Sequence, residues 1–131
     1  MRGGAFHNKI VEEAKTIFSN YGWRVFSEYR YSKNGVTTYL DLLAVRANKK
    51  IACEIETTTR HAVDNAVKAL SAGLDLWIIV PSRTLRRRVN HKLASSRLDA
   101  EHKNIRVLLF GLLEAELTFH QENNLLKGTE L

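Results

Sequence analysis

A continuous apolar run from Leu74 to Val80 constrains the fold more than any other feature of this sequence. An uninterrupted run of this length is typical of a strand that is buried on both faces of a sheet. The stretch before it has helical spacing, which supplies the crossover that a parallel pair of strands needs. Its expected inward face comprises Val63, Ala66, Val67 and Leu70. We therefore expect an α/β fold with a parallel pair in its sheet.

Three more strands are predicted ahead of this crossover, over residues 23–31, 37–46 and 51–58. Apolar and polar residues alternate along the first, and Asn34-Gly35 is a strong signal for a tight turn into the second. The second strand is apolar on both faces, as a central strand should be. A two-residue turn at Asn48-Lys49 would set Ala47 opposite Lys50 and fix the register of the third.

The remaining elements follow from apolar spacing and from glycine and proline positions. Helices are predicted over 6–20 and over the basic segment 83–97, and a further buried strand over 105–113. Residues 114–131 are ambiguous, and we expect their polar end to fray. The 131 residues contain no repeat or linker, so we expect one domain, with its core at about 6–113 and a C-terminal extension at 114–131. The predicted architecture is an αβββαβ core with a mixed central sheet flanked by helices.

Composition excludes several classes of protein. Apolar residues make up 44% and charged residues 26%, which is unlike a disordered chain. No apolar run approaches the roughly 18 residues of a membrane span. Cys53 is the single cysteine, which excludes an internal disulfide. Met1 to Asn8 carries no apolar stretch, so we expect no secretory signal, and we predict a cytoplasmic protein without a membrane partner.

The positive charge is concentrated in one segment. The formal net charge is +6, and residues 83–97 contain no acid, whereas the rest of the chain has as many basic as acidic residues. Such a segment favours a polyanionic partner, here DNA; the alternative is an ordinary solvated helix face. The candidate DNA-binding residues are Arg83, Arg86, Arg87, Arg88, Lys92 and Arg97.

Three acids are predicted to share one face of the sheet. Glu54 and Glu56 are two apart in a strand, so their side chains point the same way. With the turn at Asn48-Lys49, Asp41 lies opposite Glu56 and diagonal to Glu54. Clustered carboxylates on a half-buried surface repel one another, and a bound Mg²⁺, Mn²⁺ or Ca²⁺ would relieve this. The alternative is an exposed edge, where the acids are solvated or paired with lysines nearby.

This layout resembles the PD-(D/E)XK nuclease superfamily, in which the acid lies on the second core strand and Glu-x-Lys on the third. The matching positions are Asp41 and Glu54-Ile55-Glu56, and the resemblance runs from the first helix to Pro81. The opening MRGGAFHNKI and the YGWRVF that follows are most similar to archaeal-type Holliday-junction resolvases, and also to nuclease-like proteins of mobile elements. The family's fold is the restriction-endonuclease-like αβββαβ core.

The sequence departs from the family pattern at two places. Glu56 stands where the family usually has lysine, although some restriction endonucleases carry glutamate there. Resolvases also have a glutamate in the first helix, where this chain has His7, with Glu12 and Glu13 about two turns later. These substitutions leave the roles of His7, Glu12 and Glu13 open.

The resemblance implies a metal-dependent DNA endonuclease that hydrolyses phosphodiester bonds, with branched DNA as one substrate class. Asp41, Glu54 and Glu56 would be catalytic, and Asp41 and Glu54 would bind Mg²⁺ or Mn²⁺. Small nucleases of this kind resemble half of a symmetric dimer, so we expect a homodimer. The alternative is a catalytically inactive nuclease-fold module that binds DNA or joins a larger assembly.

Overall fold

The computed structural model describes residues 4–33, 35–98 and 104–129, the stretch 122–129 by its backbone alone. Asn34 of the predicted turn and the end of the predicted extension therefore lie outside the described residues. The elements in chain order are α1 (Ala5–Asn20), β1 (Arg24–Lys33), β2 (Val36–Arg46), β3 (Lys49–Ile55), α2 (Ala62–Ser71), β4 (Asp75–Val80), α3 (Arg83–Ser95), β5 (Ile105–Leu109), the short 3₁₀ turn η1 (Phe110–Leu112) and α5 (Leu113–Thr129).

The described strands form one sheet in the order β1-β2-β3-β4-β5. The first three form an antiparallel meander, and β3, β4 and β5 are parallel. Lys33 pairs with Val36, and Gly35 has a φ of +75°, which a residue with a Cβ rarely adopts. A mixed five-stranded sheet flanked by helices confirms the predicted α/β class.

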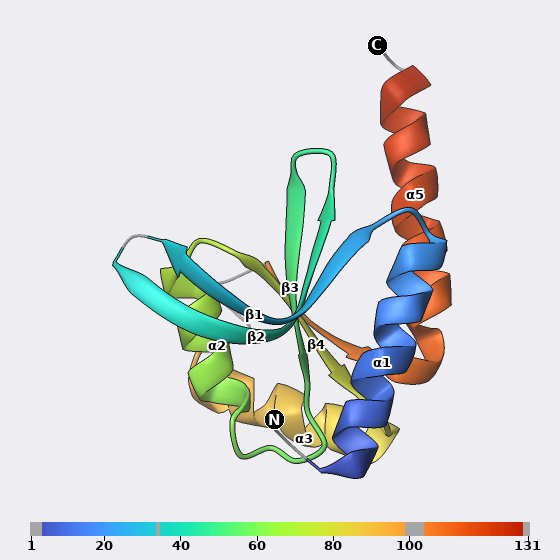
Figure 1. Ribbon diagram of the computed structural model, residues 1–131. Helices are drawn as coiled ribbons and strands as arrows, with labels where there is room; N and C mark the ends of the chain where they lie inside the picture. The colour runs from blue at the N-terminus through green and yellow to red at the C-terminus, as the bar shows by residue number, and fades with distance from the viewer. Residues whose placement is uncertain (1–3, 34, 99–103, 130–131) are drawn as a thin grey trace.

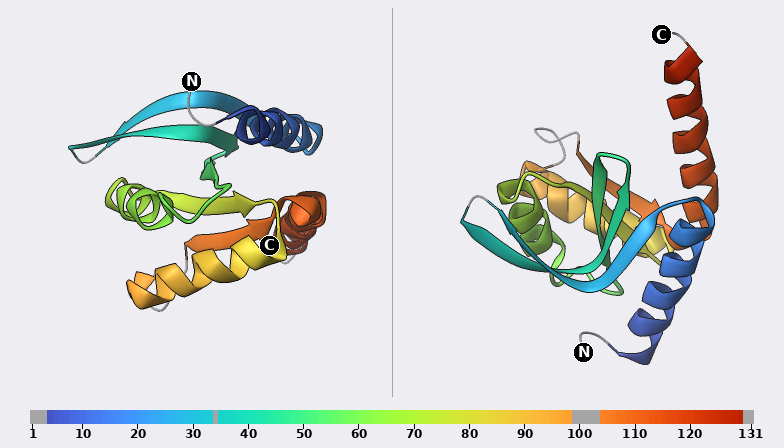
Figure 2. Two further views of the ribbon diagram at one scale, coloured as in Figure 1. Left: turned by 90° about the horizontal axis from the view of Figure 1, so that it is seen from below. Right: turned by 45° about the horizontal axis from the view of Figure 1, so that its top comes forward.

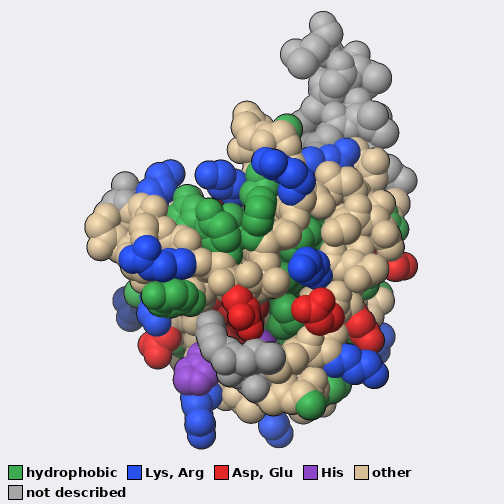
Figure 3. Space-filling model, in the orientation of Figure 1, with side chains coloured by type: hydrophobic (Ala, Val, Ile, Leu, Met, Phe, Trp, Pro, Cys, Tyr) green, Lys and Arg blue, Asp and Glu red, His purple; other side chains and the backbone are tan. Residues whose placement is uncertain are grey.

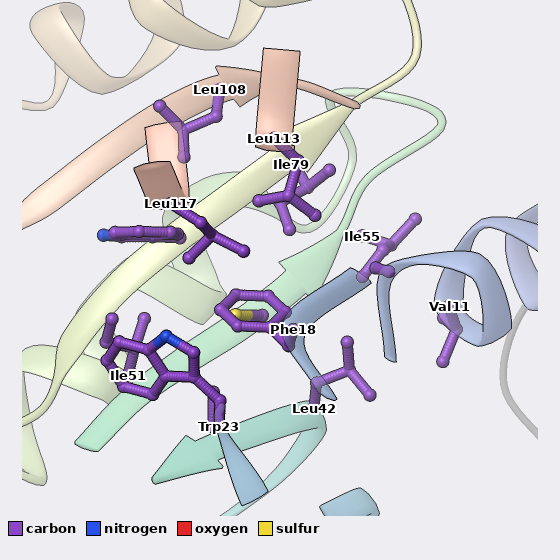
Figure 4. Packing of buried hydrophobic residues seen from close by; sticks show 14 of the residues in the cluster. Val11, Phe18, Trp23, Leu42, Ile51, Ile55, Ile79, Leu108, Leu113 and Leu117 are labelled. Carbon is purple, nitrogen blue, oxygen red and sulfur yellow. The ribbon is translucent and has the colours of Figure 1, made fainter. Parts of the chain in front are cut away.

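Helices cover both faces of the sheet (Figure 1). On one face α1 and α5 pack over the strands, and Phe18 lies at the centre of this core among Trp23, Leu117 and Ile55 (Figure 4). On the other face α2 and α3 pack over a second core, which contains Val89 and Leu93 of the basic helix. The C-terminal part of α5 extends beyond the body of the molecule (Figure 2).

The buried face of α2 differs from the predicted one. Its buried residues are Ala62, Asn65, Ala66 and Ala69, whereas Val67 is 47% exposed. Alanines allow the helix to pack close to the sheet, and Asn65 supplies a donor to a buried acid. The packing therefore follows small side chains and a polar contact rather than the largest apolar residues.

Two element boundaries also differ from the predictions. The third strand ends at Ile55 instead of Thr58, because the chain turns away from the sheet after Glu56. The strand predicted over 105–113 ends at Leu109, and the ambiguous region continues as helix α5 from Leu113. None of the described helices has the length and apolarity that crossing a membrane requires.

Candidate functional site

The candidate site lies where β2 and β3 separate. Their ladder runs from the Arg46–Lys49 pair to the Leu42–Cys53 pair. The part of β2 that precedes Leu42 pairs with β1 alone. The chain after β3 stays bound to β4, because the Glu56 N–H donates to Ile79 O at 3.0 Å. A gap therefore opens in the sheet beside Asp41.

The β2–β3 register differs from the predicted one by two residues. The turn is Ala47-Asn48 instead of Asn48-Lys49, and Ala47 has a φ of +54°. If the observed pairing is extended by one position beyond the Leu42–Cys53 pair, Asp41 lies opposite Glu54 rather than Glu56. The predicted register would instead have set Leu43 opposite Glu54, an apolar side chain against a carboxylate. A shift of two leaves every side chain on its predicted face.

Asp41 is anchored in the gap by donors from two elements. Its exposed fraction is 4%, and its Oδ2 accepts a hydrogen bond from the Ile55 N–H at 2.8 Å. The same oxygen lies 3.1 Å from Nε2 of His7, which is buried in the first turns of α1. Because Ile55 lies between Glu54 and Glu56, this anchor brings Asp41 beside both glutamates.

Glu54 and Glu56 are buried as well, with exposed fractions of 2% and 5%. Asn65 of α2 donates from Nδ2 to Glu56 Oε1 at 2.5 Å. The pKa of Cys53, the neighbour of Glu54 on β3, is affected by the negative charge around it. Burial raises the pKa of its thiol well above the usual value, and the negative charges of Glu54 and Asp41 raise it further. Asp41 and Glu54 thus act together on Cys53, and Glu56 is buried two residues beyond Glu54.

A cleft of about 750 Å³ leads to Asp41 from the surface. It lies between β2 and α2, and its lining includes Asn65, Lys68, His61 and Glu28. Lys68 is exposed, yet it borders the same cleft as Asp41. Glu28 lies opposite Asp41 in the β1–β2 register with a φ of +50°. Acidic side chains reach the surface near the centre of the face in Figure 3.

Two of these cleft residues were missed by sequence reasoning. Nothing in the local pattern marks Glu28, since its positive φ depends on the strand pairing around it. The expected inward face of α2, which includes Val67 and Leu70, turns Lys68 away from the sheet and so predicts it in solvent. Using the alanines to define the buried face would have moved it toward the cleft.

The candidate glutamates of α1 do not reach this site. Glu12 and Glu13 are exposed, whereas His7, at the position that aligns with the resolvase glutamate, contacts Asp41. The first helix therefore contributes an imidazole to the acidic region instead of a carboxylate.

The six candidate DNA-binding residues lie along α3 and just beyond it. Arg83, Arg87, Arg88 and Arg97 are exposed, and Arg86 and Lys92 are half-buried. Arg87, Arg88 and Lys92 line a groove with Thr59. Lys92 differs from the others, because its Nζ donates to Thr59 O at 2.9 Å and so ties α3 to the loop after Glu56. The chain after Glu56 thus borders both surfaces, since Thr59 lines the basic groove and His61 lines the acidic cleft.

The carboxylates are not arranged as a ready-made metal site. Among the described residues, no group of three or more His, Cys, Asp or Glu side chains is placed to hold a metal ion. Oxygen-rich carboxylate sets are nonetheless the ligands that Mg²⁺ and Mn²⁺ prefer. The chemistry of the donors fits such a cation, and metal binding by Asp41 and Glu54 stays a prediction.

Comparison with known proteins gives a fold but no activity. No protein-family model matches the chain, and no curated protein is similar to it in sequence. It is similar in structure to the crystal structure of AF1548, a protein of unknown function, with a TM-score of 0.55 and 12% identity. The match covers 87% of this chain and 67% of AF1548. At that identity the likeness concerns the fold alone.

Proposed function

We propose that this chain is a metal-dependent DNA endonuclease with a restriction-endonuclease-like core of the PD-(D/E)XK type. The observation that carries the proposal is the gathering of Asp41, Glu54 and Glu56 in a gap of the sheet. Three buried carboxylates are costly to a fold, and a catalytic cation would explain their presence. The observed order of α1, the antiparallel meander, α2 and parallel β4 supports this proposal, because the family's core has its elements in this order.

Each part of the site has a role in this proposal. Asp41 and Glu54 would hold Mg²⁺ or Mn²⁺, and Glu56 would orient or deprotonate the attacking water. When bound, the cation polarises a phosphoryl oxygen and lowers the pKa of a bound water. Asp41 and Glu56 would have to exchange the contacts with His7 and Asn65 for this role. Lys68 would place a positive charge beside the scissile phosphate, where the family's usual lysine is missing.

The basic groove indicates where the proposed substrate would bind. Thr59 lines the groove of Arg87 and Arg88, and His61, two residues later, lines the acidic cleft, so a phosphate backbone bound along α3 would pass close to that cleft. Contacts of this kind position DNA without reading its sequence. The substrate class is therefore DNA recognised through its backbone.

The test is cleavage of a panel of labelled linear and branched DNAs, with Mg²⁺ or Mn²⁺ and with chelator. We expect metal-dependent cleavage by the wild type and a loss of about 10² or more in Asp41→Asn, which keeps the shape and removes the charge. The matched control is Glu114→Gln, an exposed acid of α5, which should cleave normally. Normal cleavage by Asp41→Asn would refute the assignment.

A second candidate function is a nuclease-fold module that binds DNA without cutting it. The hydrogen bonds that hold Asp41 and Glu56, and the substitution of the usual lysine by Glu56, favour this alternative. Binding to the same DNAs that weakens with salt, without cleavage under any metal condition, would select it over the nuclease.

A further inference from the structure

A second cleft of about 750 Å³ lies where the parallel strands β3, β4 and β5 begin. Lys49 and Lys50 begin β3, Asp75 begins β4, and Arg106 lies near the start of β5. Glu56 and Val80 mark the opposite ends of these strands. The cleft is thus separate from the acidic one, and neither the proposed catalysis nor the basic groove of α3 uses it.

Positive charge dominates this second cleft. Four cationic side chains line it, with one acid, Asp75. The four are Lys33, Lys49, Lys50 and Arg106. In the space-filling view, Lys and Arg side chains gather around the β2–β3 hairpin at the upper edge of the body (Figure 3). Like charges held this close repel one another, so an anion placed between them would be attracted by all.

Aromatic rings hold two of these cations in place. Lys50 Nζ lies 5.8 Å from the centre of the Tyr31 ring, and the Arg106 guanidinium lies 5.8 Å from that of Trp77. Arg106 is also paired with Glu116 of α5. Cation–π contacts of this kind orient a charged group while leaving its other donors available. The cleft therefore has part of its charge positioned in advance.

His120 of α5 lines the cleft, and the cations nearby affect the pKa of its ring. Its ring packs between Trp23 and Trp77, and its Nε2 is buried with no hydrogen-bond partner among the described residues. Burial lowers the pKa of the imidazole below 6.5, and Lys49, Arg46 and Arg106 lower it further, against an opposing effect of Glu116. The environment of His120 therefore disfavours protonation of its ring.

We propose that this cleft binds phosphate groups that together carry several negative charges, through Lys33, Lys49, Lys50 and Arg106. They would be the phosphate chain of a nucleotide, or several successive phosphodiesters of a nucleic-acid strand, each of which is singly charged. A single carboxylate would carry too little charge for a cleft that four cationic side chains and one acid line. The proposal goes beyond the proposed nuclease activity and stands whether or not the acidic cleft cleaves DNA.

The experiment follows the ring signals of His120 by NMR while pyrophosphate is added to the full chain in the presence of chelator. We expect saturable shifts, and a pKa of His120 that rises on binding because the anion offsets the nearby cations. In Lys33→Ala/Lys50→Ala the affinity should fall about tenfold or more. The control, Lys9→Ala/Lys15→Ala, removes the same charge from α1, where neither residue lines a cleft, and should bind as the wild type does.

Two further ligands distinguish the sources of the phosphate. Tighter binding of a short oligothymidylate than of ADP identifies a nucleic-acid strand, and the reverse identifies a free nucleotide. Lys33→Gln/Lys50→Gln, which keeps more of the side chains, repeats the measurement should the alanine variant unfold. Unmoved His120 signals, or equal affinities in the cleft variant and the α1 control, would overturn the proposal.

Discussion

Asp41 and Glu56 show how single donors make buried carboxylates tolerable. An ionised carboxylate taken from water into a protein needs hydrogen bonds to replace its hydration. Asp41 obtains one from the Ile55 N–H, and Glu56 obtains one from Asn65. These donors come from the backbone of β3 and from α2, so the acids are held by groups that the fold itself positions.

Replacing Asn65 by Ala should therefore destabilise the fold. The change removes a donor from a buried acid, and we expect the free energy of unfolding to fall by about 1 to 3 kcal/mol. Urea denaturation measures this. Asn90→Ala, an exposed position of α3, should change it by less than about 0.5 kcal/mol.

A double-mutant cycle makes this prediction specific. In Glu56→Gln the acid is already neutral, so the further loss of Asn65 should cost less than it costs the wild type. Equal costs in the two backgrounds would mean that the Asn65–Glu56 contact carries none of the effect.

The sequence did not predict the role of Asn65, because the largest apolar residues were used to define the buried face of α2. Val67 and Leu70 are the larger side chains, so the periodicity placed the buried face there. The alanines at 62, 66 and 69 share a different face with Asn65, which the close packing of α2 on the sheet selects. Such packing depends on the buried glutamate beneath the helix, and a helix considered alone does not reveal it.

At the scale of elements, the β2–β3 hairpin shows which errors in a predicted register change the face on which side chains lie. The predicted turn at Asn48-Lys49 is wrong by one position, because the turn is Ala47-Asn48 and Ala47 takes a positive φ that residues with a Cβ rarely adopt. The structure accepts this backbone at Ala47 and gains apolar pairs between Leu43 and Ala52 and between Ala44 and Ile51. Because the error is an even number of residues, the shared face of the acids was predictable even though the pairing partner of Asp41 was not.

Helix α3 should bind DNA mainly through charge. If the four arginines of α3 and Arg97 just beyond it each neutralise one phosphate, log K should fall against log salt with a slope of about −4 to −5. Lys92 is left out of this number because it donates to Thr59 O. Arg87→Ala/Arg88→Ala should flatten the slope by about 1 to 2 units in a binding titration at several salt concentrations.

The control for this measurement removes equal charge from another helix. Lys9→Ala/Lys15→Ala on α1 should leave the slope within the error of the wild type. A slope that is the same in all three proteins would show that the basic face of α3 is only solvated.

At the scale of the whole molecule, the antiparallel meander and the parallel crossover followed from the sequence. The apolar run at 74–80 required a helical connection, and the observed β3–β4 pair is parallel as expected. How the helices meet the gap between β2 and β3 could not be predicted. The contact of His7 with Asp41 joins residues 34 positions apart, and it depends on how the start of α1 meets the end of the sheet.

The proposed cation site makes a prediction about global stability that needs no DNA. A ligand that binds only the folded chain stabilises it by RT ln(1 + [L]/Kd), about 1.4 kcal/mol at ten times Kd. For a domain of this size, that corresponds to a rise of several degrees in Tm. We expect Mn²⁺ or Mg²⁺ to produce this rise in the wild type by differential scanning fluorimetry.

Variants of the acids decide whether that rise comes from the proposed site. Asp41→Ala should lose most of it, because the cation loses one of its anionic ligands, while Glu114→Ala on α5 should keep it. Glu56→Gln should leave the metal-free fold at least as stable as the wild type, since it removes repulsion within the buried cluster. If Asp41→Ala and the wild type show equal shifts, the cation binds elsewhere. If no protein shows a shift, the buried acids serve the fold alone, and the module that binds DNA without cutting it becomes the better description.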